Sequence, residues 1–289
     1  MNFQEAKLQK VQLDVLGRIC RFEIQRDDLL HPIVSGNKWR KLKGWVNLYN
    51  SENYEGILTF GGAYSNHLLA TAAYGFHVNI PTVGVIRGEE GFDNHYLSYC
   101  ESVGMELHYV SRTDYRDKTL CANRSLNGRN FLVIPEGGKG FSGLLGFEEL
   151  INSWTVEPEI VVCASATGTT ALGLSAALLK RGWKTRVKAV LVLKNLEEQL
   201  QFWEKFPALS SLIDPVLGYE FGGYAKSSPD LIQFIRHIQP QVDFPIDPVY
   251  VAKGLFALWD HPDWSDLRTI YLHTGGQWGR DSERFKALL

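Results

Sequence analysis

The chain has 289 residues, a formal net charge of -2 and 45% apolar residues. This length and composition fit one large domain or two moderate ones with a sizeable core. The near-neutral charge gives no basic field, so we expect no nucleic-acid partner. We also expect no membrane partner, because no apolar run approaches the roughly 20 residues that span a bilayer.

The cysteines and histidines indicate neither disulfides nor a metal site. The cysteines are scattered, with no C-x-x-C pair, and the 8 histidines include no H-x-x-x-H pair. The first residues, Met1 to Glu5, lack the apolar core of a secretion signal. We therefore expect a cytoplasmic protein with reduced cysteines.

Strand-like apolar runs alternate with helical patterns along the chain. In chain order, the patterns predict a strand at 56–60, a helix at 65–75, a strand at 80–86, a helix at 93–103, strands at 106–110 and 131–134, a helix at 143–151, a strand at 160–164, a helix at 170–180, and strands at 187–193 and 269–273. This alternation predicts the α/β class, with mostly parallel sheets flanked by helices. The glycine-rich stretch at 135–146 is the nearest feature to an internal boundary.

Gly138, Gly140 and Gly143 match the G-x-G-x-x-G pattern between a predicted strand and a predicted helix. That context is typical of a dinucleotide-binding turn. The match lies in mid-chain, however, and Glu157 and Glu159 precede the next strand instead of ending it. We favour a glycine-rich crossing between two lobes.

A second turn, at 166–170, follows a short apolar strand and opens a helix. The small residues Thr167, Gly168, Thr169 and Thr170 let successive backbone N–H groups point into one concavity, where a helix N-terminus favours an anion. No lysine follows as in a nucleotide-binding loop, so a single phosphate fits better than a triphosphate. Taken alone, an ordinary strand-to-helix turn explains the pattern equally well.

Two more motifs bring polar groups to loop positions. Ser65, Asn66 and His67 lie where the strand at 56–60 leads into its helix, so Ser65 can cap that helix and free N–H groups can bind a carboxylate. Lys38 lies in a basic run, most of which we expect to be solvated. An amine, polar donors and a phosphate-binding turn are together the parts that a pyridoxal 5'-phosphate (PLP) enzyme needs.

Four stretches of the chain also carry a resemblance to a known family. They are RDDL at 26–29 with SGNKWRKL at 35–42, GGAYSNH at 61–67, ATGTT at 166–170, and DPVY at 247–250 followed by HTGG at 273–276. In residues and in order they resemble the 1-aminocyclopropane-1-carboxylate (ACC) deaminase / D-cysteine desulfhydrase family, fold type II PLP enzymes of the tryptophan-synthase-β type. The resemblance implies a large lobe of residues 1–50 and 142–289, a small lobe of residues 51–141, and PLP in the cleft between them. It also implies a homodimer and a small amino-acid substrate.

The resemblance implies roles for individual residues. Lys38 is expected to be the Schiff-base lysine and the general base. Ser65, Tyr250 and Tyr224 are expected to be catalytic groups on the substrate side. The residues expected to contact PLP besides Lys38 are Asn66, Thr167, Gly168, Thr169, Thr170 and Thr274, and those expected to contact the substrate are Ser65, Asn66, His67 and Tyr250.

One position departs from the ACC deaminases. After the tyrosine of DPVY, they resemble one another in carrying Glu, which pairs with the ring nitrogen of PLP, whereas this chain has Val251. In HTGG it has Thr274, as desulfhydrase-like members do. Without a carboxylate there, we expect a largely unprotonated ring nitrogen and a weaker electron sink. His67, where the deaminases tend to have Gln, points the same way.

We therefore expect a PLP-dependent lyase that acts on D-cysteine by α,β-elimination, giving pyruvate, ammonia and sulfide. Two other functions remain open. One is ACC deamination in the same pocket. The other is a PLP-binding protein with little catalysis, although such a protein would not need Lys38, Ser65, His67 and Tyr250 together.

Overall fold

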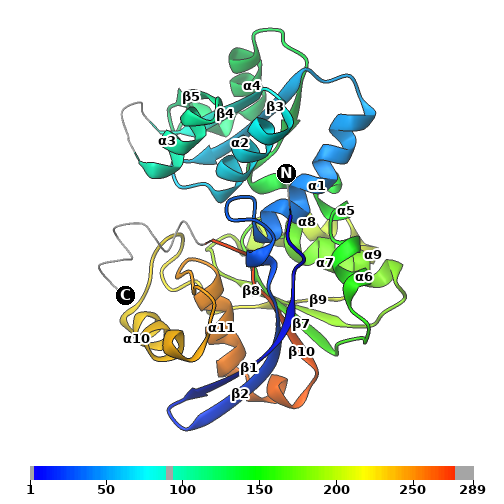
Figure 1. Ribbon diagram of the computed structural model, residues 1–289, viewed down its shortest axis with the longest axis vertical. Helices are drawn as coiled ribbons and strands as arrows, with labels where there is room; N and C mark the ends of the chain where they lie inside the picture. The colour runs from blue at the N-terminus through cyan, green and yellow to red at the C-terminus, as the bar shows by residue number, and fades with distance from the viewer. Residues whose placement is uncertain (1–2, 89–93, 277–289) are drawn as a thin grey trace.

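The computed structural model describes residues 3–88 and 94–276, which form two α/β lobes stacked along the long axis of the molecule (Figure 1). The smaller sheet, at the top of Figure 1, has four parallel strands in the spatial order β5-β4-β3-β6. Its strands are β3 Gly56–Gly62, β4 Thr82–Arg87, β5 Glu106–Val110 and β6 Phe131–Ile134.

The larger sheet has six strands in the order β1-β2-β10-β7-β8-β9. Its first two strands form an antiparallel hairpin at one edge, and all other neighbours are parallel. Its strands are β1 Leu8–Val15, β2 Arg18–Gln25, β7 Ile160–Ser165, β8 Arg186–Leu191, β9 Ile213–Val216 and β10 Thr269–Leu272. The predicted fold class, two mostly parallel sheets flanked by helices, is confirmed.

Helices cover both sheets. The α-helices are α1 Gly36–Ser51, α2 Asn66–Val78, α3 His95–Ser102, α4 Lys118–Leu126, α5 Phe141–Leu145, α6 Glu148–Ser153, α7 Thr169–Lys180, α8 Leu196–Glu204, α9 Pro207–Ser210, α10 Pro229–Ile238 and α11 Val251–Asp260. Short 3-10 turns are η1 Asp27–Leu29, η2 Asp114–Arg116, η3 Glu136–Gly138, η4 Gln239–Gln241 and η5 Pro262–Asp266. None of the described helices is long and apolar enough to cross a membrane.

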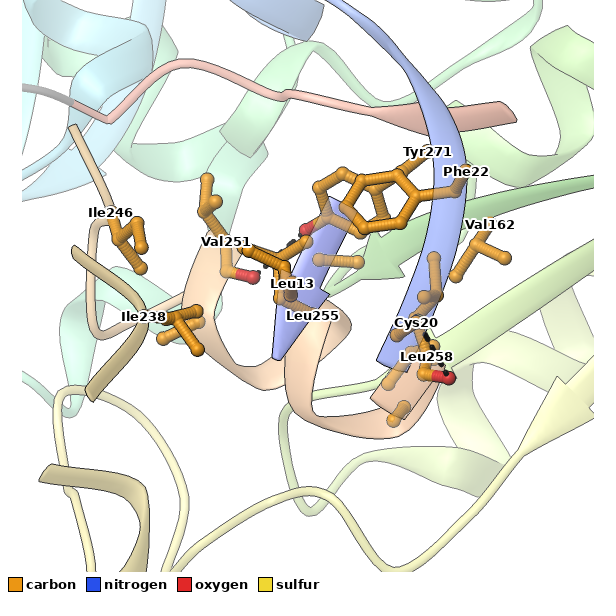
Figure 2. Close-up of a cluster of buried hydrophobic side chains, with 14 of the residues drawn as sticks. Leu13, Cys20, Phe22, Val162, Ile238, Ile246, Val251, Leu255, Leu258 and Tyr271 are labelled. Carbon is orange, nitrogen blue, oxygen red and sulfur yellow. Dashed lines mark hydrogen bonds between the residues drawn. The ribbon is translucent and has the colours of Figure 1, made fainter. Parts of the chain in front are cut away.

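The apolar strands of the larger sheet bury both of their faces. Val162 and Tyr271 belong to the cluster shared with α10 and α11, which Figure 2 shows in part. Their chain neighbours Cys163 and Ile270 belong to a second cluster, shared with α6 and α7 on the opposite face. Alternate residues of a strand point to opposite faces, so a continuous apolar run is what a strand covered on both sides requires.

Helix α1 packs against both lobes. Its Leu42 joins a cluster that includes Ile57 of the smaller sheet. On another side α1 lies against α5, where a Cβ on Gly44 would come within 1.8 Å of the Ser142 carbonyl oxygen. The glycine-rich stretch therefore forms a crossing that packs backbone to backbone on α1, as the sequence favoured over a dinucleotide turn.

The predicted elements differ from the structure in several places. The sequence missed the hairpin β1–β2, strand β9 and helices α1, α8, α10 and α11. The helix predicted at 143–151 is two short helices, α5 and α6. The helix predicted at 93–103 is α3, and its first predicted residue, Asp93, lies outside the described residues. The lobe boundaries stay a prediction.

Candidate active site

A cavity of about 1540 Å³ lies between the two sheets and is lined from both lobes. Its wall includes the loop after β3, the ends of β4 and β5, and the turn between β7 and α7. It therefore faces the carboxyl edges of parallel strands, where α/β sheets place their ligands. All site residues predicted from the sequence line it except Gly168 and Thr169.

Lys38 projects into this cavity from the first turn of α1. Its Nζ donates a 3.2 Å hydrogen bond to Asn37 Oδ1 and lies 5.8 Å from the centre of the Tyr250 ring. Burial lowers the pKa of Lys38 from 10.5 to about 8, against the opposing charge of Asp247. With this pKa about 10% of the amine is neutral at pH 7, roughly 300 times the fraction for an ordinary lysine. Lys38 is therefore suited to attack a carbonyl group.

Buried ion pairs fix the start of α1. Arg40 makes hydrogen bonds of 3.0 and 2.9 Å to both carboxylate oxygens of Asp27, and Arg26 makes two of 2.9 Å to Asp28. These pairs explain why the RDDL and SGNKWRKL stretches occur together. The expectation that most of the basic run is solvated is wrong for Arg40 and Lys41, which are 5% and 3% exposed.

The turn before α7 has the features of an anion site. Gly168 precedes the helix with a φ of +77°, and no described side chain caps the helix. Thr167 Oγ1 lies 3.2 Å from Thr169 Oγ1, and Thr170 Oγ1 accepts a 2.9 Å hydrogen bond from Asn37 Nδ2. Because Thr167 and Thr170 line the cavity, the N–H groups at the start of α7 can serve an anion there. Asn37 links this turn to the neighbouring Lys38.

The start of α2 forms the opposite wall. Ser65 is the N-cap, and its Oγ accepts a 3.3 Å hydrogen bond from the Leu68 N–H, which confirms the predicted cap. Asn66 Oδ1 accepts a 3.2 Å hydrogen bond from the Tyr96 hydroxyl. The Leu68 N–H is already bonded, so the N–H groups of Asn66 and His67 are those left for a ligand carboxylate.

His67 is the most informative side chain of that wall. It is 1% exposed, and neither ring nitrogen has a hydrogen-bond partner among the described residues. Burial, helped by the charges of Lys38 and Lys41, lowers the pKa of His67 to about 3, so its ring is neutral near pH 7. Leaving such polar atoms unpaired costs about 1–3 kcal/mol. An unpaired, buried imidazole on a cavity wall indicates a polar ligand.

The remaining predicted residues lie on the larger lobe. Tyr250 precedes α11, and its ring faces the Lys38 amine. The Tyr224 hydroxyl reaches across the cavity to the Tyr64 carbonyl oxygen at 3.5 Å. Thr274 packs so closely on the loop before α1 that a Cβ on Gly36 would lie 2.1 Å from its carbonyl oxygen.

Val251 is not where the sequence placed it. It does not line the cavity, and its side chain is fully buried in the cluster of Figure 2. Its carbonyl oxygen accepts a 2.9 Å hydrogen bond from the Tyr271 hydroxyl, drawn as a dashed line there. The expectation that Val251 stands beside a bound ring was wrong, because the first turn of α11 directs this residue into the core.

The sequence missed two groups at the site. Lys41 lines the cavity, and its Nζ donates to the Gly137 carbonyl oxygen at 3.3 Å. Burial and the charge of Lys38 lower its pKa well below 10.5. Its position three residues after Lys38 places both amines on one helix face, which the spacing could have shown.

The second missed group is Asp247, a buried carboxylate at the start of α11. It accepts hydrogen bonds of 3.0, 2.9 and 3.0 Å from the backbone N–H groups of Val249, Tyr250 and Val251. It lies behind Gly276, whose backbone lines the cavity. An aspartate before an apolar helical run is a typical N-cap, so the DPVY stretch itself carried the signal.

These side chains fit the groups of PLP. The α7 turn and Lys41 offer donors and positive charge for a phosphate, Lys38 offers an amine for the aldehyde, and His67 has unpaired polar atoms. The described residues contain no group of three or more His, Cys, Asp or Glu side chains able to hold a metal ion.

Comparisons with known proteins agree with this site. No protein-family model matches the chain. It is 26% identical over 272 residues to "Putative 1-aminocyclopropane-1-carboxylate deaminase" of Pyrococcus horikoshii, which covers 88% of this chain and 83% of that protein. It is 24% identical over 290 residues to "Bifunctional D-cysteine desulfhydrase/1-aminocyclopropane-1-carboxylate deaminase, mitochondrial" of Arabidopsis thaliana, covering 89% and 72%. It is 25% identical over 294 residues to D-cysteine desulfhydrase of Salmonella paratyphi B, covering 91% and 88%.

Solved structures show the same architecture. A structure described as an ACC deaminase homologue superposes with a TM-score of 0.80 over 99% of this chain and 94% of that one, at 24% identity. A bacterial-type threonine deaminase superposes with a TM-score of 0.62 over 88% and 86%, at 17% identity. The fold is therefore tryptophan-synthase-β-like, and the resemblance that the motifs carried is confirmed.

Proposed function

We propose, from the premise that this chain belongs to the ACC deaminase / D-cysteine desulfhydrase family of fold type II PLP enzymes, that it binds PLP at Lys38 and releases ammonia from a small amino acid. One observation carries the proposal. A buried lysine with its pKa lowered to about 8 shares a cavity with a neutral histidine whose ring nitrogens lack partners among the described residues.

Four features of the chain would hold the cofactor. The N–H groups at the start of α7 and the ammonium of Lys41 would bind its phosphate. Lys38 would form the covalent link, and the Thr274 hydroxyl would face the ring. Bound PLP would supply an electron-withdrawing ring that stabilises negative charge on the substrate's α-carbon.

The other wall would hold the substrate. The N–H groups of Asn66 and His67 would bind its carboxylate at the start of α2. The neutral His67 ring can donate from one nitrogen and accept at the other, so it would orient a polar group without adding charge. Lys38, once released from the cofactor, would take the α-proton at Nζ, for which a pKa of about 8 is well placed. Ser65 and Tyr250 supply hydroxyls on this side of the cavity.

Among substrates, we place ACC first and D-cysteine second. Four relatives, three from Pyrococcus species and one from Thermotoga maritima, are named putative ACC deaminases. The argument against ACC rested on Val251 beside the ring, and that side chain lies in the core instead. D-cysteine keeps support from the neutral Thr274 on the cavity wall and from the Salmonella relative.

A substrate panel tests this proposal. Purified protein loaded with PLP is first treated with borohydride, and mass spectrometry should find the cofactor fixed to the peptide that contains Lys38. Lys38→Ala should lose both the adduct and turnover. Untreated holoenzyme is then incubated with ACC, D-cysteine, L-cysteine and D-serine. ACC should give 2-oxobutyrate and ammonia, whereas cysteine would give pyruvate, ammonia and sulfide.

The outcomes separate the candidates. A higher kcat/KM for ACC than for D-cysteine supports the proposal, and the reverse order would restore D-cysteine as the first substrate. A silent panel from protein that carries PLP on Lys38 would favour a PLP-binding protein with little catalysis. An adduct on any lysine other than Lys38 would refute the assignment of the site.

A further inference from the structure

Lys253 is a buried lysine outside the cavity wall. Its side chain, on the first turn of α11, is 0% exposed. Its Nζ donates three hydrogen bonds to backbone carbonyl oxygens, to Glu220 at 2.7 Å, to Gly223 at 2.9 Å and to Val192 at 3.2 Å. An ammonium group has three donors, so this environment satisfies all of them. A group so costly to bury and so fully bonded calls for an explanation beyond packing.

Two of these oxygens belong to the loop that carries Tyr224. The loop runs through left-handed conformations at Phe221, Gly222, Gly223 and Ala225, with φ values of +45°, +92°, +110° and +52°. Non-glycine residues pay a free-energy cost for such φ values, so the loop needs outside bonds to hold its shape. Its internal backbone bonds join Gly223 N–H to the Glu220 oxygen at 2.8 Å and Lys226 N–H to the Gly223 oxygen at 3.3 Å.

The third oxygen belongs to the segment after β8. Val192 directly precedes Leu193, which lines the cavity together with Asn195. Asn195 Nδ2 donates a 2.7 Å hydrogen bond to the Ala166 carbonyl oxygen, in the turn before α7. Lys253 thus connects the Tyr224 loop to the segment that supports the phosphate turn.

We propose that Lys253 is a positioning residue, whose ammonium clamps the Tyr224 loop onto the end of β8 and so fixes the Tyr224 hydroxyl across the cavity. The Tyr224 hydroxyl lies 3.5 Å from the Tyr64 carbonyl oxygen, one residue before the α2 cap. The clamp therefore acts on the contact between the two lobes at the cavity. Lys253 itself does not line the cavity, so it acts through the segments that it holds.

A charge is essential to this arrangement. Three carbonyl oxygens converge on one point, and an apolar side chain would leave all three without that partner in the interior. Methionine has similar length and no donor, so Lys253→Met removes the clamp with little change in volume. A purely structural role would loosen the protein everywhere, whereas a clamp would loosen the two bonded segments first.

Hydrogen–deuterium exchange tests the clamp without reference to any reaction. In Lys253→Met, amides of residues 217–227 and 192–195 should exchange about tenfold faster or more than in the unmodified protein, while β3, β4 and β7 keep their rates. The matched control is Lys43→Met, since Lys43 is a half-buried lysine that pairs with Glu149. It should leave residues 217–227 unchanged. Equal acceleration throughout the chain, or none in residues 217–227, would overturn the proposal.

A second arm measures the effect on Tyr224 and rests on the proposed function. With the best substrate of the panel, Lys253→Met and Tyr224→Phe should each lower kcat/KM, and the double variant should lie no more than about twofold below the less active single variant. Losses that multiply would mean that Lys253 does not act through Tyr224. If the panel is silent, the exchange measurement still decides the clamp.

A smaller side chain guards against misfolding. Lys253→Ala leaves room for a small cation at the three oxygens, so methylammonium added to this variant should restore slow exchange in residues 217–227. Tetramethylammonium, which has no N–H donor, should not. Failure of Lys253→Met to fold, together with no recovery of Lys253→Ala by methylammonium, would assign Lys253 a structural role and overturn the proposal.

Discussion

At the scale of single residues, burial prepares the amine of Lys38. Removal from water disfavours the charged form and lowers its pKa to about 8, while the charge of Asp247 acts in the opposite direction. Asp247 is itself held by three backbone N–H groups, which keep it in place. The two groups together set how much neutral amine is present at a given pH.

This balance predicts a pH dependence for cofactor attachment. Since only the neutral amine attacks an aldehyde, the rate at which PLP links to the apoenzyme should rise with pH and level off above the pKa of about 8. Between pH 7 and 8 the neutral fraction grows about fivefold, and between pH 8 and 10 less than about twofold. Stopped-flow absorbance gives the rate, with Nα-acetyl-lysine as the control, whose rate should still rise near pH 10. A midpoint near 10 for the protein would contradict the buried amine.

Asp247→Asn provides the sign of the second contribution. The carboxylate raises the pKa of Lys38, so its removal should shift the midpoint of the attachment rate to lower pH. An unchanged or higher midpoint would show that Asp247 does not act on this amine. Circular dichroism checks that the variant keeps its fold, since the amide oxygen can still accept backbone hydrogen bonds.

At the scale of elements, the turn before α7 joins strain to function. A Cβ on Gly168 would adopt a φ of +77° and come within 2.7 Å of Trp203 Nε1, which already donates a 2.9 Å hydrogen bond to the Gly168 carbonyl oxygen. The other end of α7 offers a comparison, because Gly182 has a φ of +78° and nothing within 4 Å of an added Cβ. The two glycines share a backbone conformation and differ in their surroundings.

The pair predicts different outcomes for the same substitution. Gly182→Ala should cost about 1 kcal/mol of unfolding free energy and leave PLP affinity unchanged. Gly168→Ala should cost more, because Trp203 must move, and should also weaken PLP binding by displacing the N–H groups at the start of α7. Urea unfolding and a PLP titration measure the two effects. Equal PLP affinity in both variants would place the phosphate away from this turn.

The elements also show what the sequence could predict. The central strands were found because β3, β4 and β7 are almost continuous apolar runs, as burial on both faces requires. Strand β1 reads LQKVQLDV, and only three of its eight residues are buried, so it lacks such a run. Helix α1 carries buried Arg40 and Lys41 on a basic sequence, and only the partners across the fold make that burial possible.

The same contrast holds for the site. The residues that line the cavity came from motifs at loop positions, and the structure brings nine of the eleven predicted ones to its wall. Val251 was misplaced because its direction depends on how α11 packs, which no local pattern contains. Lys253 was missed because its three partners come from two loops that lie at least 30 residues away along the chain.

At the scale of the whole molecule, the charge of the cavity differs from that of the chain. The chain carries a formal net charge of -2. Among the described residues, however, the basic residues that line the cavity are Lys38, Lys41, Arg87, Arg112, Arg116 and Lys139, and the acidic ones are Glu136 and Glu198. Even with both buried lysines neutral, basic groups outnumber acidic ones. Strand pairing places Arg87 beside Gly62, next to the loop that leads to α2.

Such a cavity should attract anions from solution. A charged cleft between low-dielectric walls raises the rate of ligand encounter, and salt screens this attraction over a Debye length of about 10 Å at 0.1 M. PLP is an anion, so its association rate with the apoenzyme should fall several-fold between about 0.02 and 0.5 M salt, while its dissociation rate changes much less.

One charge on the rim tests whether the cavity itself is responsible. Arg112 is exposed and lines the cavity, so Arg112→Gln should slow PLP association at low salt and match the unmodified protein at high salt. Lys184→Gln makes the same charge change at an exposed position that does not line the cavity, and it should alter neither rate. Equal slowing by both variants would mean that PLP responds to net charge alone. Slowing by Arg112→Gln that persists at high salt would mean that this arginine contacts PLP directly.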